Sequence, residues 1–355
     1  MRLGINSAID QVERICISVN TCCNYACEYC YFFDDANRVS PKIPLDSKEI
    51  ELIIERAFKY HKKYNFSKRT KINFVGSGEP LLNWTELSKA VSGFWERHFG
   101  QDCIRFYIVT NGSLITPTIA QEMKRLMIVP SVSLDGPKEL HNAHRIFPNG
   151  KGTFDKTMNG IMLLQDAGLN VTINTTLTRN LLENIDLYID FIIQQKFAKI
   201  IFDRLVDAPK GIDKISDEEN YTFLSATAEL LKQHNLEHLE IGNIEAYQRS
   251  ISGIPDQVCT MFGSSCGAGT HFLIYANREV YPCGRMLGKT QWLLGNYKEE
   301  IDELQKRMYK KMPYKSDCLS CTVSKECIRD CILERNCDNY NCQSRQKFLC
   351  SFQNR

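Results

Sequence analysis

The first two thirds of the chain alternate between short apolar runs and longer segments with apolar residues at helical spacing. A short apolar run between turn residues predicts a strand, and a three-to-four-residue spacing predicts an amphipathic helix. In segment 47–64, Ile50, Ile53 and Ile54 share one helical face, and Asp46 or Ser47 fits as the N-cap. Strands are predicted over 15–19, 71–75, 104–110, 129–134, 170–177 and 199–205, and the helices that follow them over 47–64, 82–98, 117–127, 154–167, 181–195 and 217–234.

This alternation predicts an α/β fold. Six strand–helix units of roughly 30 residues are typical of parallel strands joined by crossover helices. Eight such units close a TIM barrel, so six predict an open, partial (β/α)6 TIM-like barrel. Folds of this kind place their chemistry at the carboxyl ends of the strands, so the residues that follow each strand are the candidates for a site.

Cysteine density divides the chain in two. Ten of the sixteen cysteines lie at or beyond Cys259, and the middle of the chain contains one, Cys103. We therefore predict a barrel domain over 1–235 and a Cys-rich C-terminal domain over 236–355.

Composition and charge argue against several classes of protein. The net charge is +2 with 24% charged residues, so no overall field favours nucleic acid or a membrane surface. The chain has no run of ~18 apolar residues that could span a bilayer, and residues 1–11 lack the features of a signal peptide. Many cysteines without a secretion signal indicate metal ligands rather than disulfides. Because such metal clusters are oxygen-sensitive, we expect a cytoplasmic enzyme that works under low oxygen.

Three cysteines near the N-terminus, Cys23, Cys27 and Cys30, have the spacing C-x3-C-x2-C. Three thiolates in so short a loop can bind one metal centre together. An iron–sulfur cube bound by three cysteines keeps one iron open for a substrate or cofactor, whereas a cluster that only carries electrons usually takes four. The alternatives are zinc and disulfides. Zinc knuckles usually pair C-x2-C with a second pair of Cys or His, and no such pair follows nearby. Cys16, Cys22 and Cys103 are expected to be small buried apolar residues.

Glycines and polar residues follow the predicted strands. Gly76-Ser77-Gly78-Glu79-Pro80 comes after the second strand, where two glycines allow the backbone to approach a ligand closely. Asn111 ends the third strand and Ser133 the fourth, and Asn174 lies on the fifth. Arg145 could clamp a carboxylate through two hydrogen bonds. The structural alternatives are a plain turn at Asn111, a surface position for Arg145 and a strand-edge contact for Asn174.

The cysteine spacing, with an aromatic residue (Tyr29) before the third cysteine, resembles the signature of the radical S-adenosylmethionine (SAM) superfamily. The resemblance implies a [4Fe–4S] cluster on Cys23, Cys27 and Cys30, with SAM chelating the fourth iron. It also implies that SAM is cleaved to a 5′-deoxyadenosyl radical, which removes a hydrogen atom from the substrate. The protein would then position and shield the reactants.

The segments after the strands also match this family in order. Residues 76–80 resemble the Gly-Gly-Glu-Pro motif that holds the amino group of SAM, with Ser77 where the first glycine usually stands. The resemblance makes Ser133 a candidate contact to the ribose or carboxylate of SAM. Arg145 is a candidate for the carboxylate, Asn174 for the adenosyl group, and Asn111 for a further cofactor contact.

A second cysteine pattern, C-x2-C-x5-C-x3-C from Cys318 to Cys331, resembles the SPASM domain, an extension of radical SAM enzymes with two auxiliary [4Fe–4S] clusters. Four-cysteine ligation suits electron transfer, and a zinc ribbon is the structural alternative. The resemblance implies three [4Fe–4S] clusters in all, with one auxiliary cluster on Cys259, Cys266, Cys283 and Cys331 and the other on Cys318, Cys321, Cys327 and Cys350.

Two features depart from the SPASM pattern. Arg278 stands where a glycine is usual, five residues before Cys283. Cys337 and Cys342 are additional, and either could replace Cys350 as the last ligand.

SPASM enzymes mostly modify peptides or proteins, so the resemblance implies a peptide maturase. We expect a radical SAM oxidoreductase that takes a hydrogen atom from a ribosomally made peptide and cross-links or oxidises it. The alternatives are formylglycine formation, as in anaerobic sulfatase maturases, and small-molecule alcohol oxidation or epimerisation. Sulfatase maturases have an Asp base after the cysteine that matches Cys283, where this chain has Gly284-Arg285. Asp203 and Asp207, at the end of the sixth strand, could substitute as the base, or they could be solvated loop carboxylates.

The implied partners are a peptide or protein substrate and an electron donor such as flavodoxin or ferredoxin, without nucleic acid or membrane. The first strand is predicted from residue 15, so we expect no leader-binding domain before it. A separate leader-peptide-binding protein could then take that role. The non-enzyme alternatives, a ferredoxin-like electron carrier or a zinc scaffold, leave six strand–helix units with SAM-type loops unexplained.

Overall fold

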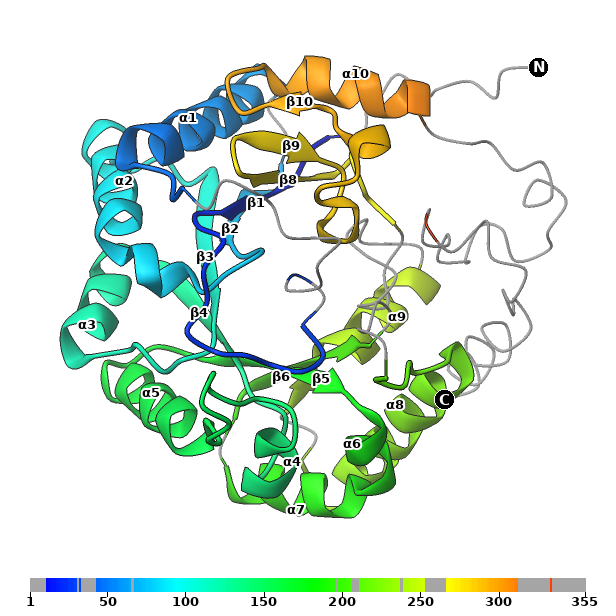
Figure 1. The fold of residues 1–355 in the computed structure, drawn as a ribbon. Coiled ribbons are helices and arrows are strands. Elements are labelled where there is room, and N and C mark those ends of the chain that lie inside the picture. Colours follow the sequence, from blue (N-terminus) through cyan, green and yellow to red (C-terminus); the bar gives the residue numbers. More distant parts are fainter. Residues whose placement is uncertain are drawn as a thin grey trace, which may run out of the picture.

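A curved sheet with helices on its outer side forms the centre of the fold (Figure 1). The computed structural model describes residues 11–30, 32, 43–64, 67–195, 197–205, 211–236, 239–252, 266–311 and 333. Within these residues the sheet has ten strands in the order β10-β9-β8-β1-β2-β3-β4-β5-β6-β7. Strands β1 to β7 run parallel to one another, β8 is parallel to β1, and β9 and β10 are antiparallel to their neighbours.

The strands are short, and most are followed by a helix. Their bounds are β1 (Arg14–Ser18), β2 (Thr70–Phe74), β3 (Ile104–Thr110), β4 (Ile128–Ser133), β5 (Thr172–Leu177), β6 (Lys199–Arg204), β7 (Glu240–Ile241), β8 (Phe272–Ala276), β9 (Glu279–Tyr281) and β10 (Gly295–Asn296). The helices are α1 (Ser47–Tyr64), α2 (Trp84–Arg97), α3 (Pro117–Arg125), α4 (Lys138–Asn142), α5 (Phe154–Asp166), α6 (Arg179–Glu183), α7 (Ile185–Gln194), α8 (Asp217–Gln233), α9 (Gly242–Ile251) and α10 (Ile301–Lys311).

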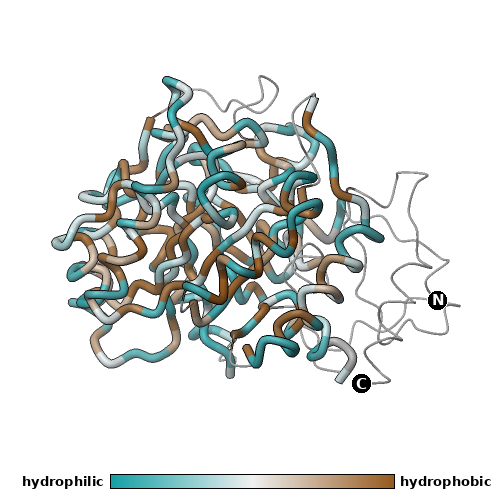
Figure 2. The backbone as a smooth tube through the Cα atoms, turned by 90° about the horizontal axis from the view of Figure 1, so that it is seen from below, coloured by the Kyte–Doolittle hydropathy of each residue, from teal (hydrophilic) through white to brown (hydrophobic). Residues whose placement is uncertain are grey.

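The two faces of the sheet differ in character. On the outer face, Phe106 packs edge-on against Phe94 and Trp95 of α2, with ring centroids 5.5 Å apart in both pairs. On the inner face, polar side chains such as Asn73 and Asn174 are only half-buried. Figure 2 shows the apolar segments running through the interior of the fold. The main core therefore lies between the sheet and the helices, and the inner face remains available for polar chemistry.

The predicted α/β partial barrel is confirmed. Strands β1 to β6 are the six predicted strands, with bounds that differ by no more than two residues, and α1 covers the predicted residues with Asp46 as its cap. One predicted helix, 181–195, is two helices that meet at Asn184. There the Asn184 side chain donates to Asn180 O at 2.8 Å, a local hydrogen bond that competes with regular helix geometry.

The sheet continues beyond residue 235, where the barrel domain was predicted to end. β7 and α9 add a short seventh strand–helix unit, and β8 pairs in register with β1. The segment 266–311 is also fastened to α1, because Arg56 pairs with Glu300 and the Tyr60 hydroxyl donates to Gln305 at 3.2 Å. The division into two domains remains a prediction.

The turn between β8 and β9 contains Asn277 and Arg278, whose φ angles are 49° and 65°. Glycine adopts this left-handed region without strain, whereas arginine rarely does. Arg278 is held there by a two-pronged ion pair with Glu49 at the start of α1, with Nε–Oε1 and Nη2–Oε2 distances of 2.6 and 2.7 Å. The ion pair explains how arginine occupies a position where the SPASM pattern usually has glycine.

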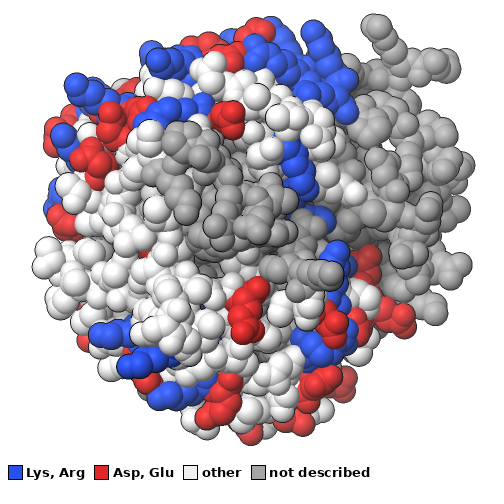
Figure 3. Space-filling model, viewed as in Figure 1, with Lys and Arg blue, Asp and Glu red and all other residues white. Residues whose placement is uncertain are grey.

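Charged side chains of both signs are interspersed around the rim of the face seen in Figure 3. None of the helices in the described ranges is both long and apolar enough to cross a membrane.

Replacing Phe106 by alanine should destabilise the protein strongly. Phe106 is fully buried among aromatic rings, so Phe106→Ala removes buried area and leaves a cavity. We expect the free energy of unfolding, measured with urea on the metal-free protein, to fall by about 3–5 kcal/mol. Phe99→Ala is the matched control, because Phe99 is 88% exposed, and it should change stability by less than about 0.5 kcal/mol. Equal effects of the two substitutions would contradict the packing described here.

Candidate active site

The loop after β1, residues 20–30, carries Cys23, Cys27 and Cys30 and is called the cluster loop below. In the sheet β1 neighbours β2, which is followed by β3 and β4. Because the carboxyl ends of parallel strands meet at one edge of a sheet, the loops after β2, β3 and β4 can all reach the cluster loop. Each of them contacts it.

The loop after β2 pairs with the cluster loop through backbone groups. Glu79 N donates to Cys22 O at 2.8 Å, and the Asn20 side chain donates to Glu79 O at 2.7 Å. A Cβ at Gly78 would lie 2.4 Å from Cys22 O, and a Cβ at Gly76 would lie 2.5 Å from the Ser18 Cβ. Both glycines are therefore required for the contact with β1 and the cluster loop, a reason that the sequence did not reveal.

Ser77 and Pro80 also fit this loop. The Ser77 hydroxyl lies 2.9 Å from that of Ser18, and Ser77 N donates to the Ser18 hydroxyl at 3.1 Å. A serine in place of the usual glycine thus gains a buried partner at the end of β1. Pro80 begins a 3₁₀ helix over Pro80–Asn83, a position where proline loses no backbone hydrogen bond.

The Glu79 side chain joins the ends of β2 and β3. It accepts hydrogen bonds from the Thr110 hydroxyl at 2.6 Å, from Asn111 N at 2.8 Å and from Leu81 N at 3.1 Å. Burial raises the pKa of Glu79 to about 7, although these three donors oppose the shift. The carboxylate therefore holds the two strand ends at a fixed spacing.

The end of β3 contacts the first half of the cluster loop. The Asn111 side chain donates to Asn24 Oδ1 at 2.9 Å, and its Nδ2 lies 3.9 Å from Cys23 Sγ. The Thr157 hydroxyl donates to Asn111 O at 3.0 Å and lies 3.0 Å from the Tyr25 hydroxyl. Asn111 is therefore more than a plain turn residue, because it orients the loop beside Cys23.

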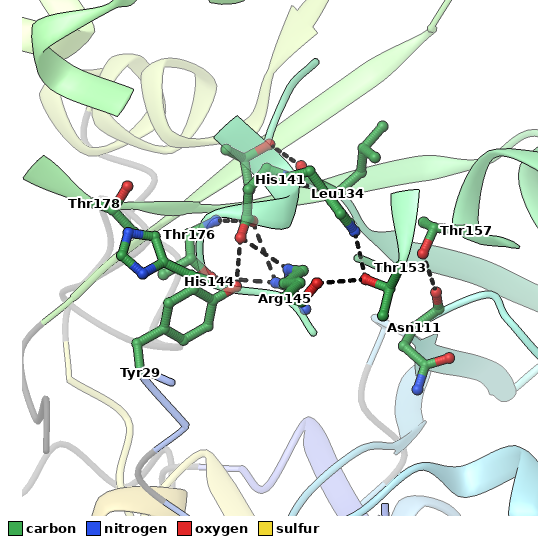
Figure 4. A network of polar contacts seen from close by, with 12 residues as sticks. Tyr29, Asn111, Leu134, His141, His144, Arg145, Thr153, Thr157, Thr176 and Thr178 are labelled. Carbon is green, nitrogen blue, oxygen red and sulfur yellow. Dashed lines mark hydrogen bonds and ion pairs between the residues drawn. The ribbon is translucent and has the colours of Figure 1, made fainter. Parts of the chain in front are cut away.

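The segment after β4 contacts the second half of the cluster loop (Figure 4). The Tyr29 hydroxyl donates to Asp135 Oδ2. Arg145 binds the same carboxylate with Nε–Oδ2 and Nη2–Oδ1 distances of 2.8 and 3.2 Å, and Thr176 N donates to Oδ1 at 2.9 Å. Burial works against the charge on Asp135, but the pKa is lowered because Arg145 is close and Arg145 and Tyr29 donate to it.

Arg145 is buried, so the alternative of a surface arginine is wrong. Its guanidinium also lies 5.4 Å from the centre of the Tyr29 ring. Backbone hydrogen bonds add to this contact, from Ala26 N to Ile146 O at 2.8 Å and from Glu28 N to His144 O at 3.0 Å. In this structure the charge of Arg145 is matched by Asp135.

The three thiols of the cluster loop are half-buried. Burial raises the pKa of Cys23 to about 11 and that of Cys27 to about 12, and the charge of Cys30 adds to both shifts, so the sulfur atoms are neighbours. Among the described residues no three Cys, His, Asp or Glu side chains converge on a single ion. Three thiols on one short loop suit a multinuclear cluster, whose irons each take their own ligand. A bound metal would deprotonate them despite the burial.

A family model described as the Radical SAM superfamily matches residues 17–192, which include the cluster loop and the strand ends that hold it. The chain belongs to the radical SAM superfamily. This membership implies a [4Fe–4S] cluster and SAM as cofactors.

Relatives and solved structures agree with this radical SAM assignment. A cysteine-type anaerobic sulfatase-maturating enzyme of Clostridium novyi is 28% identical over 272 residues, covering 74% of this chain and 70% of that protein. Native anSMEcpe with bound AdoMet and Cp18Cys peptide has a TM-score of 0.78 at 19% identity, covering 96% of this chain and 98% of that one. Streptococcus suis SuiB bound to precursor peptide SuiA has a TM-score of 0.67 at 18% identity, covering 91% and 72%. At these identities the two structures establish the radical SAM fold alone.

The inner face of the radical SAM barrel carries the remaining described candidates. Ser133 and Asp203 lie at the ends of β4 and β6, Asn174 lies within β5, and all three are half-buried. Asn174 Oδ1 accepts from the Ser131 hydroxyl at 2.8 Å. Asp203 differs, because its Oδ1 is buried without a hydrogen-bond partner among the described residues. Burial raises the pKa of Asp203 to about 7, with a smaller opposing effect from Arg145.

Several predicted residues lie outside the part of the chain that the structure describes. They are Asp207, Cys259, Cys318, Cys321, Cys327, Cys331, Cys337, Cys342 and Cys350. Of the predicted auxiliary-cluster ligands, Cys266 and Cys283 are described, and both are half-buried. Cys283 precedes the short 3₁₀ helix Gly284–Met286. Of the other cysteines expected to be buried, Cys16 is buried and Cys103 half-buried, but Cys22 is exposed, although its backbone oxygen accepts from Glu79 N.

Sequence reasoning did not identify Asp135, His141 and Thr153 as part of the site. Asp135 follows two residues after Ser133, and only Ser133 was predicted as a candidate. His141 and Arg145 are four residues apart, a spacing that places both on one side of a helical segment. This spacing could have indicated that the two residues belong to one site. Nothing in the sequence singled out Thr153.

Asp203→Asn should flatten the pH dependence of stability. Because the pKa of Asp203 is about 7, the folded state keeps a proton that the unfolded chain releases near pH 4. The wild-type protein should therefore lose stability as pH rises from about 4 to about 7, and this carboxyl contributes up to about 1.4 kcal/mol per pH unit. Urea unfolding of the metal-free protein across this range measures the slope. The same slope in Asp203→Asn would show that the Asp203 pKa is not raised in the folded state.

Proposed function

We propose that this radical SAM enzyme is a maturase that removes a hydrogen atom from a peptide and oxidises or cross-links it. The observation that carries the proposal is Asp203 Oδ1, which is buried on the inner face of the barrel without a hydrogen-bond partner among the described residues. Asp203 is also close enough to Arg145 and Asp135 to feel their charges. A carboxylate oxygen that the described residues leave without a donor is suited to act on a substrate. Peptide binding by anSMEcpe and SuiB supports a peptide as that substrate.

Cys23, Cys27 and Cys30 would hold a [4Fe–4S] cluster, which with SAM supplies the radical that takes the hydrogen atom. The loop 76–80, Asn111, Ser133, Arg145 and Asn174 are the proposed contacts to SAM. Gly76, Ser77, Gly78, Glu79 and Pro80 would act chiefly through the backbone, since the Glu79 carboxylate is used within the protein. Arg145 would bind the SAM carboxylate only if that group joins Asp135 beside the guanidinium.

Asp203 is the proposed proton acceptor. Loss of a hydrogen atom followed by net oxidation of the substrate also releases one proton and one electron. A base with a pKa near the working pH combines the correct protonation state with sufficient strength, and the pKa of Asp203 is about 7. Asp207, the other proposed base, comes four residues later in the sequence and lies outside the described residues.

The released electron requires an acceptor. We propose two auxiliary [4Fe–4S] clusters for this role, on the SPASM-type cysteines together with Cys266 and Cys283.

Flavodoxin or ferredoxin would supply the electron for SAM cleavage, and a separate protein could bind a leader peptide. Oxygen-sensitive clusters favour the cytoplasm as the location.

The second candidate is formylglycine formation in a sulfatase. Similarity to sulfatase-maturating enzymes favours it, whereas Gly284-Arg285 after Cys283 provides no carboxylate base there. Incubation with SAM, reductant and either a sulfatase peptide or small peptides encoded beside the gene separates the two. A product two mass units lighter from a serine peptide, or eighteen lighter from a cysteine peptide, would favour sulfatase maturation.

Cys23→Ala should abolish SAM cleavage. After anaerobic iron reconstitution the wild-type protein should contain about twelve irons, as three [4Fe–4S] clusters require, and form 5′-deoxyadenosine with dithionite. The variant should contain about four fewer irons and form none. Cys22→Ala is the matched control, because Cys22 is adjacent but exposed, and it should match the wild type. If Cys23→Ala still formed 5′-deoxyadenosine, the assignment of the cluster ligands would be wrong.

Asp203→Asn should separate SAM cleavage from product formation. The amide cannot accept the proton, so 5′-deoxyadenosine should still form while the yield of modified peptide falls by about 100-fold or more. Both are measured by mass spectrometry in the same reaction. Asp155→Asn, an exposed carboxylate on α5, is the control and should retain full yield. A normal yield with Asp203→Asn would mean that another group is the base.

A further inference from the structure

The two ends of segment 135–145 are connected through His141, a fully buried histidine in α4 (Figure 4). At one end, Asp135 N donates to His141 Nδ1 at 3.3 Å. At the other, His141 Nε2 lies 3.0 Å from the Thr153 hydroxyl, which donates to Arg145 O at 2.8 Å. His141 and Thr153 therefore link the backbone of Asp135 to the backbone of Arg145.

These contacts determine where the protons of His141 lie. Nδ1 accepts from a backbone N–H, so it carries no proton. Thr153 uses its only hydroxyl proton on Arg145 O, so it must accept from His141, and Nε2 must carry the proton. A neutral ring is consistent with a pKa near 4, which results from burial and the nearby Arg145. The imidazole thus accepts on one side and donates on the other, and only one tautomer satisfies both partners.

We propose that His141 is a positioning residue for the cluster loop. It fixes the backbone at both ends of the segment whose side chains, Asp135 and Arg145, bind each other and Tyr29. Tyr29 directly precedes Cys30. A change in the spacing of Asp135 and Arg145 would therefore shift Tyr29 and, with it, the proposed cluster ligand Cys30. The inference rests on the proposed assignment of Cys23, Cys27 and Cys30 to the cluster.

The chain provides a matched control for this arrangement. His61 of α1 is also buried, and its Nδ1 lies 3.0 Å from the hydroxyl of Thr70, a fully buried residue of β2. The contact between His61 and Thr70 lies at the start of β2, whereas the cluster loop follows the carboxyl end of β1. Removing either threonine hydroxyl therefore removes a buried His–Thr contact. Only removal of the Thr153 hydroxyl should affect the cluster loop.

Thr153→Val and Thr70→Val remove the two hydroxyls with little change of shape. Replacing a group that orients a metal ligand typically lowers metal affinity by 10–100-fold. The cluster to follow is the one whose electron paramagnetic resonance signal changes when SAM is added. We expect Thr153→Val to lose iron from this cluster to a chelator about tenfold faster than the wild-type protein. Thr70→Val should lose it at the wild-type rate, and Thr153→Ser, which keeps the hydroxyl, should restore that rate. Equal rates for Thr153→Val and Thr70→Val would overturn the proposal.

A second measurement reads the network in the wild-type protein and needs no cluster. Nitrogen-15 NMR of the metal-free wild-type protein reports the tautomer of each histidine, and His141→Gln assigns the signal. We expect His141 as the neutral form with the proton on Nε2. A proton on Nδ1, or a ring that is charged at pH 7, would overturn the proposal, and this result decides the case if Thr153→Val does not fold. A wild-type protein without any SAM-responsive signal would instead contradict the proposed function.

Discussion

The buried ion pair between Asp135 and Arg145 is the interaction on which the described part of the site depends. Burying two charges is costly unless the remaining hydrogen-bonding positions are filled. Here each carboxylate oxygen has two donors, since Arg145 reaches both oxygens, Thr176 N reaches Oδ1 and the Tyr29 hydroxyl reaches Oδ2. The pair therefore does more than neutralise a charge. It fixes the second half of the cluster loop against β4 and β5.

Parallel strand order makes this attachment possible. Tyr29 and Asp135 are 106 residues apart in sequence, yet both follow strands whose carboxyl ends share one edge. Hydrogen bonds through Glu79 and Asn111 hold the first half of the cluster loop in the same way. Three strand-end loops thus support one short loop of thiols, while the inner face of β4 to β6 presents half-buried polar side chains. This arrangement suits a site where a reactive centre must be held rigidly beside a substrate.

Much of this could be predicted from the sequence, because strands and helices leave a regular apolar pattern. The six strands, the α1 helix and the three-cysteine loop all follow from local residues. The roles of single polar residues did not, since they depend on contacts between distant segments. Gly76 and Gly78 were predicted to let the backbone approach a ligand, and the structure adds a second reason for them, the close approach of Ser18 and Cys22. Ser77 and Arg278 departed from family patterns, and only the partners Ser18 and Glu49 explain why the fold accepts them.

The break at Asn184 has the same origin. Helical periodicity continues through 181–195, but a single side-chain amide that bonds to Asn180 O interrupts it. β7, β9 and β10 have only two or three residues each, too few for a periodic pattern. β8 is as long as β1, but its place in the sheet depends on pairing with β1, which lies more than 250 residues away in sequence.

The central claim is that Cys23, Cys27 and Cys30 hold a cluster with an open iron that binds SAM at this edge of the barrel. Electron–nuclear double resonance of the reduced protein with SAM labelled by nitrogen-15 at its amino group tests it most directly. The account predicts a nitrogen-15 hyperfine coupling to the cluster in the wild-type protein and none in Cys27→Ala. A reconstituted wild-type cluster without that coupling, or the same coupling in Cys27→Ala, would contradict it.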